Sequence, residues 1–243
     1  MISYISGEHP FFNSYPIDFQ EAIDSACALP ELSEIRGVIG SIGIQVGGTK
    51  EAKALWCWKE RMIKIHSDLL KDTKANQAAY LVFELFNVLQ TPQFERAVAE
   101  AADVDSFVAS IEKLEYASAL STQRFFRQHF EKNVEFDFKY VCPNFHEHYA
   151  LNQISGHSEC IARSYFPSAS YRGTLCHPLQ DLDDTARQLL YCLMYSKMTG
   201  KMISVARGSK PVGFKEILHA LERHAASNDS YQKALECAQD LFQ

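Results

Sequence analysis

The most apolar helical run of the chain lies at residues 76–90, with the sequence Asn-Gln-Ala-Ala-Tyr-Leu-Val-Phe-Glu-Leu-Phe-Asn-Val-Leu-Gln. A helix that is apolar on nearly every face belongs in a core, because burying each large apolar side chain contributes roughly 1.5–3 kcal/mol. The middle of this run carries two strongly polar side chains, Glu84 and Asn87. They are three residues apart, so they lie on one helical face and can share a neighbour.

The next predicted helix, residues 105–126, carries a polar pair at the same spacing, Glu112 and Glu115. If the two helices pack together, three carboxyl groups and one amide converge. A buried carboxylate must find a partner or stay protonated. Glu84, Asn87, Glu112 and Glu115 are therefore the first candidate site, and hydrogen bonding to a buried neighbour such as Arg124 is the purely structural interpretation.

Hydrophobic spacing elsewhere predicts an α+β fold, because strands cluster early in the chain and helices follow. The expected architecture is a small N-terminal antiparallel sheet packed on the buried helix and the long helix, followed by a C-terminal helical subdomain. A further strand is expected at residues 134–141. The early strands are expected at 41–46, 55–58 and 61–66, and the helices at 17–28, 31–40, 76–90, 93–102, 105–130, 181–200, 213–226 and 230–242.

Residues 1–178 are expected to form the α+β domain and residues 179–243 the helical subdomain. The link at residues 176–180 is short, so one continuous domain is the alternative. Residues 142–178 are irregular and rich in Ser, His, Tyr and Pro. A segment of this length is too long for a passive connector and is expected to cover a cleft or to contact a partner.

Composition and charge exclude several function classes. The chain has 243 residues and a formal net charge of −6, and it contains no basic run, which argues against nucleic-acid binding. No window approaches eighteen uninterrupted apolar residues, so no membrane span is expected. The N-terminus lacks the basic segment and apolar stretch of a secretory signal, so none is expected there. Seven cysteines without a Cys-x-x-Cys pair indicate reduced thiols and a cytoplasmic location, in the cell of origin or in a host.

A strand, a loop and an apolar helix with a central Glu form an arrangement that resembles the zincin metallopeptidases. There the helix carries His-Glu-x-x-His, in which two imidazoles bind zinc and the Glu activates water. The matching segment here is Phe83-Glu84-Leu85-Phe86-Asn87, which keeps the Glu and lacks both histidines. The resemblance covers roughly residues 55–120 and places Glu112 or Glu115 at the third-ligand position. It extends to bacterial effector-like or toxin-like proteins that are labelled as metallopeptidases.

A second candidate cluster follows the predicted strand at 134–141. Thiolate and imidazole are the ligands that zinc prefers, and a thiol beside an imidazole is also a nucleophile with its base. The spacing matches no standard zinc finger, so ordinary loop and core roles are the alternative. As a hydrolase site, the cluster would use Cys160 with His146 or His148. As a zinc site it would use Cys142, His146, His157 and Cys160.

Two functions from different classes follow from these patterns. The first is an interaction protein, effector-like, on a metallopeptidase-like domain that has lost its zinc histidines, with a protein partner and no cofactor. The second is a hydrolase or group-transfer enzyme that uses Glu84 and Glu115, or Cys160 with a histidine. Zinc is the cofactor that a surviving metal site would hold.

Overall fold

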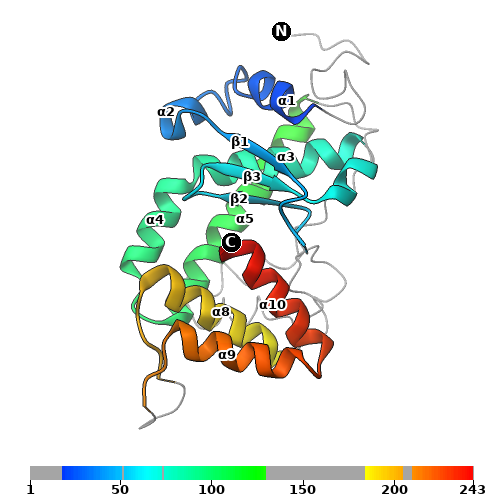
Figure 1. Cartoon of the computed structure of the whole chain (residues 1–243). Helices are drawn as coiled ribbons and strands as arrows, with labels where there is room; N and C mark the ends of the chain where they lie inside the picture. Colours follow the sequence, from blue (N-terminus) through cyan, green and yellow to red (C-terminus); the bar gives the residue numbers. More distant parts are fainter. Residues whose placement is uncertain (1–17, 51, 73, 130–183, 205–209, 243) are drawn as a thin grey trace. The chain divides into compact units, whose positions relative to one another are not determined.

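The computed structural model describes residues 18–50, 52–72, 74–129, 184–204 and 210–242 (Figure 1). The chain divides into two compact units. One is formed by the described residues of Met1–Pro92 and Glu115–Phe138, the other by those of Gln93–Leu114 and Lys139–Gln243. The expected α+β class with a helical C-terminal part is confirmed.

The first unit begins with two short helices, α1 (Phe19–Ala26) and α2 (Ile35–Ile39). Asp18 caps α1, because its Oδ1 accepts hydrogen bonds from the backbone N–H groups of Gln20 and Glu21, both at 3.0 Å. Carboxylates are preferred at this position since they pair with amides that lack helical partners. The buried residues of α1 are Phe19, Ala22, Ile23 and Ala26, which form one apolar stripe.

Three strands form a single sheet in the order β1-β3-β2 (Figure 1). They are β1 (Gly43–Val46), β2 (Ala54–Cys57) and β3 (Met62–Ile65). The prediction of an antiparallel sheet is wrong for one of its two pairings: β2 pairs antiparallel with β3, but β1 pairs parallel with β3. After β1 the chain forms β2 at the opposite edge and then turns back to place β3 between them. Strand β3 therefore runs antiparallel to β2 and parallel to β1.

The predicted apolar helix is α3 (Lys74–Leu89), and it packs against β2, α1 and α2. It follows a short 3-10 helix, η2 (Ser67–Lys71). Six of its apolar side chains are fully buried, as the sequence predicted: Ala78, Ala79, Leu81, Val82, Leu85 and Val88. The helix is therefore the core element of the first unit.

The long helix α5 (Val104–His129) runs through residues of both units. Its C-terminal half presents a stripe to the first unit, in which buried Ser118, Thr122, Phe125 and Phe126 recur at helical spacing. The ring of Phe125 contacts Phe86 of α3 edge-on, with 6.3 Å between centroids. Arg124, the suggested neighbour of Glu84 and Asn87, is exposed instead.

The second unit contains α4 (Thr91–Glu100) from residue 93 onward, the start of α5, and three C-terminal helices. These are α8 (Asp184–Thr199), α9 (Phe214–Ala225) and α10 (Asp229–Phe242), which pack on one another. Gly200 ends α8 with a φ of 72°, a left-handed conformation that glycine adopts without strain. Phe107 of α5 packs edge-on against Tyr195 of α8, with 5.8 Å between centroids. None of the helices in the described part of the chain combines the length and the apolar character needed to cross a lipid bilayer.

Candidate functional site

Glu84 lies in the middle of α3 and is only 3% exposed. Its Oε2 accepts a hydrogen bond from the backbone N–H of Trp56 in β2, at 2.9 Å. In the antiparallel pairing of β2 with β3, the carbonyl of Lys53 accepts the N–H of His66. Backbone groups alternate in direction along a strand, so the N–H of Trp56, three residues further on, points away from β3. The carboxylate therefore accepts a hydrogen bond from a backbone amide that faces outward from the β2 edge of the sheet.

Asn87 joins Glu84 to the long helix. Its Nδ2 donates to Glu84 Oε2 and to Glu115 Oε2, each at 3.1 Å. The structure thus brings Glu84, Asn87 and Glu115 together, as packing of the two helices predicted. One amide with two N–H groups can bridge two carboxylates in this way, because each hydrogen serves one acceptor.

Two buried oxygen atoms at this seam have no hydrogen-bond partner among the described residues, Asn87 Oδ1 and Ser118 Oγ. Ser118 is fully buried and lies one helical turn after Glu115 on α5. An unpaired buried acceptor costs about 1–3 kcal/mol. The polar seam between α3 and α5 is therefore less fully satisfied than an ordinary core contact.

Burial raises the pKa of Glu84 to about 7, and the hydrogen bonds from Asn87 and from the Trp56 amide act in the opposite direction. Burial wins because removing a carboxylate from water disfavours its charged form more than two hydrogen bonds favour it. A carboxyl group with this pKa can hold or release a proton near neutral pH. The same burial keeps its oxygen atoms away from a substrate in solution.

Trp56 fixes the position of this carboxylate from the sheet side. Its side chain is 8% exposed, and its indole Nε1 donates to Thr91 Oγ1 at 3.0 Å. The Thr91 hydroxyl in turn donates to the carbonyl of Val88 at 2.8 Å. The Trp56 side chain thereby connects β2 to the end of α3 through Thr91. The Trp56 amide connects β2 to the middle of α3 through Glu84.

Sequence reasoning missed the role of the Trp56 amide and the buried hydroxyls of Ser118 and Thr122. The hydroxyls could have been found, since Glu115, Ser118 and Thr122 recur at three and four residues and so share a face. The Trp56 amide could not, because it depends on which strand lies at the edge of the sheet.

The remaining predicted positions of the first site have different outcomes. Phe83 and Asn87, which stand where the zincin motif has histidines, are both buried, with Phe83 6% and Asn87 4% exposed. The side chain of Glu112 lies outside the described part of the structure, and so does the whole Cys/His cluster, which falls in residues 130–183: Cys142, His146, His148, His157 and Cys160. Within the described residues, no group of three or more His, Cys, Asp or Glu side chains is arranged to hold a metal ion.

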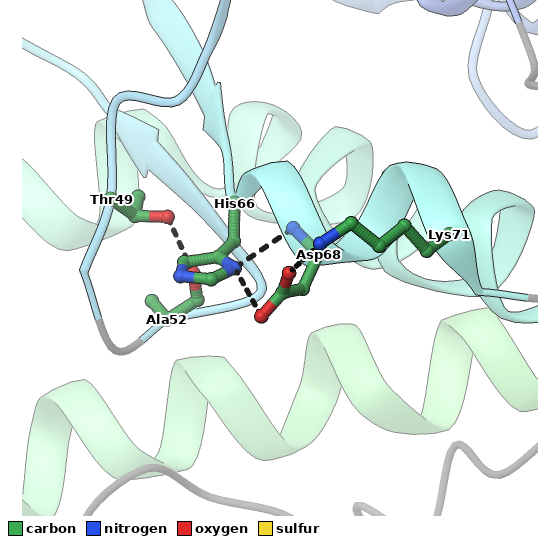
Figure 2. Close-up of polar contacts among 5 residues, drawn as sticks. All are labelled: Thr49, Ala52, His66, Asp68 and Lys71. Carbon is green, nitrogen blue, oxygen red and sulfur yellow. Dashed lines mark hydrogen bonds and ion pairs between the residues drawn. The ribbon is translucent and has the colours of Figure 1, made fainter.

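A second polar cluster, which the sequence did not indicate, lies where β3 leads into η2. His66 Nδ1 accepts the backbone N–H of Asp68 at 3.1 Å, and Asp68 Oδ1 pairs with Lys71 at 2.8 Å. Figure 2 shows the imidazole between the loop of Thr49 and Ala52 and the first turn of η2. The hydrogen bond from Lys71 lowers the pKa of Asp68. These contacts cap a short helix and hold the loop that follows β3.

Two described thiols are unsuited to nucleophilic chemistry at neutral pH. Burial raises the pKa of Cys57 to about 11 and that of Cys192 to about 11. Because the thiolate is the nucleophile, a thiol with such a pKa is almost wholly unreactive at pH 7. Strand β2 and helix α8 therefore contribute no activated cysteine at these two positions.

No protein-family model, curated protein or solved structure matches this chain. The chemistry of the site therefore rests on its own geometry.

Proposed function

We propose that this chain is a protein-interaction module that performs no hydrolysis, and that Glu84, Asn87 and Glu115 hold its scaffold together. The observation that supports this proposal is the state of the Glu84 carboxylate. It is 3% exposed, and its Oε2 is bonded both to the Trp56 amide and to Asn87. A general base must reach the proton that it abstracts, whereas this carboxylate is directed into a sheet edge and a helix seam.

The resemblance to zincins fits this proposal as a degenerate metallopeptidase-like helix. Phe83 has no atom that ligates zinc, and the Asn87 amide is already engaged with two carboxylates. Such a helix keeps its Glu because the carboxylate satisfies a strand amide. In this proposal the function lies on the surface of the scaffold and in a protein partner, with no cofactor.

Glu84→Gln tests the proposal, because it keeps the shape of the side chain and one acceptor oxygen but removes the ionisable group. We expect the variant to retain the binding partners of the wild type in quantitative affinity capture and to change only the stability of the fold. Hydrolysis of fluorogenic peptides and esters should be equally absent from both proteins. A wild-type activity that disappears in a Glu84→Gln protein that is still folded would refute the proposal.

An enzyme that uses Glu84 and Glu115 is the second candidate, favoured by the raised pKa of Glu84, since a group that titrates near 7 suits acid/base work. The Cys160 and histidine version of that enzyme, and the zinc site of the same segment, stay predictions.

Elemental analysis tests the metal variants of these sites. We expect protein purified without a chelating tag to carry less than stoichiometric zinc, and the content to be the same in Glu84→Ala and His146→Ala. Stoichiometric zinc that is lost in Glu84→Ala would place a metal at the carboxylate site. Loss only in His146→Ala would place it in the Cys/His segment.

A further inference from the structure

Strand β1 forms one edge of the sheet, with β3 as its neighbour. Gly43 donates its N–H to the carbonyl of Arg61 at 2.9 Å, and Gly47 donates to that of Ile65 at 2.8 Å. Backbone groups alternate in direction along a strand, so Ile44 and Val46 direct theirs away from β3. Within the described part of the chain, no strand pairs with this edge of the sheet.

The two edges of the sheet differ in how they are protected. At the β2 edge, the outward amide of Trp56 is taken by the Glu84 carboxylate. Natural edge strands are usually protected by very short length, charges, Pro or bulges. Strand β1 is short, but its sequence Gly-Ile-Gln-Val contains neither a charge nor Pro. Its Val46 is 48% exposed, one of three large hydrophobic side chains exposed in the described residues. The β1 edge therefore keeps the features that allow another strand to pair with it.

An exposed basic side chain stands near each end of this edge, although the whole chain is acidic. Two other basic residues nearby are already paired, Arg36 with Asp24 and buried Lys64 with Glu60, so they add no charge to this edge. Exposed Arg61 stands beside the Gly43 end of β1, where its carbonyl accepts the Gly43 amide. Exposed Lys50 follows the other end by four residues. The charge that complements the two ends of β1 is negative.

We propose that the β1 edge binds an extended, acid-flanked segment of a partner protein by β-strand addition. The inference rests on the proposed interaction role and names the chemistry of the partner. Main-chain hydrogen bonds to Ile44 and Val46 supply the pairing, and Arg61 and Lys50 select acidic residues at the two ends of the segment. Four residues of strand span about 13 Å, which a segment of about five residues covers.

A synthetic peptide with the sequence Glu-Val-Thr-Val-Glu, acetylated and amidated, is the probe. Its sequence reads the same in both directions, so it serves parallel and antiparallel pairing alike. We expect saturable binding to the full chain at low salt, and slower hydrogen exchange at the amides of Ile44 and Val46 in the bound state. The control peptide Lys-Val-Thr-Val-Lys should bind at least about tenfold more weakly, because like charges meet at both ends.

Val46→Pro removes the outward N–H at the edge and leaves the ladder with β3 intact, since edge strands accept Pro where the N–H faces away from the sheet. We expect it to weaken binding of the acidic peptide by about five- to tenfold, as the loss of one backbone hydrogen bond with added steric hindrance implies. Val46→Thr, which keeps the N–H and the branched shape, should bind within about twofold of the wild type.

Lys50→Glu gives a second measurement that does not depend on how Val46→Pro folds. It should weaken binding of the acidic peptide by about threefold at low salt, with a smaller effect at high salt. Lys215→Glu, the same change on exposed α9 of the other unit, should have no effect.

Slow exchange of the Ile44 and Val46 amides in the free protein would overturn the proposal, because it would mean that the edge is already covered, by a second copy or by another segment of this chain. Equal binding by wild type and Val46→Pro would overturn it as well. Neither result bears on the interaction role itself, which the Glu84→Gln comparison tests independently of β1.

Discussion

Replacing Trp56 by Ala should lower the free energy of unfolding by about 3–5 kcal/mol, the usual range for truncating a buried aromatic residue. The indole is 8% exposed and lies on the same face of the sheet as its cross-strand partner Ile63, which is fully buried. Its removal leaves a cavity and also frees the Thr91 hydroxyl from its indole donor. Denaturant unfolding followed by circular dichroism measures the effect.

Thr91→Val is the matched control for this change, because it keeps the shape of the side chain and removes its hydroxyl, which accepts the indole N–H and donates to the Val88 carbonyl. It should cost about 1–3 kcal/mol, the penalty of a buried unpaired donor. A Trp56→Ala cost no larger than that of Thr91→Val would mean that the indole contributes a hydrogen bond but little packing, and that β2 is held mainly through its backbone.

The sequence predicted the local elements of both units because each depends on neighbouring residues. Apolar spacing located α3, and Pro92 lies in the first turn of α4 as expected from its missing N–H. Gly200 ends α8. Helix spacing also predicted that Glu84, Asn87 and Glu115 meet if α3 and α5 pack together, and Asn87 does bond both carboxylates.

The order of the strands could not be predicted in the same way. Three consecutive short strands are equally consistent with an antiparallel meander and with the observed order β1-β3-β2. That order decides which backbone amides lie at an edge, and so it decides the role of Glu84. Without knowing that Trp56 lies at an edge, its amide could not be identified as the partner of the Glu84 carboxylate. Arg124, which is exposed, was a wrong suggestion for that partner.

The polar seam and the β1 edge support one interpretation of this scaffold. The Glu84 carboxylate accepts the outward N–H of Trp56 in β2, so that amide cannot pair with a further strand. Pairing is left to β1, whose outward amides belong to Ile44 and Val46. A carboxylate that would be a water-activating base in a zincin is, in this proposal, a cap for a strand.

Glu84→Gln should remove about 3 kcal/mol of pH dependence from the stability of the protein between pH 4.5 and pH 7. The folded-state pKa of Glu84 is raised from 4.5 to about 7. Folding therefore favours the protonated acid: its contribution is fully present below pH 4.5 and is lost as the pH rises through 7. A difference of about 2.5 pKa units corresponds to about 3 kcal/mol.

The measurement is the free energy of unfolding of wild type and Glu84→Gln from pH 4.5 to pH 8. The variant should gain stability relative to the wild type across this range, because Gln has no proton to lose. Glu34→Gln, the same change at an exposed carboxylate of the first unit, should follow the wild type. Parallel curves for wild type and Glu84→Gln would contradict a raised pKa. They would mean that the folded state stabilises the Glu84 anion as well as water does, which requires more polar contact than the Trp56 amide and Asn87 provide.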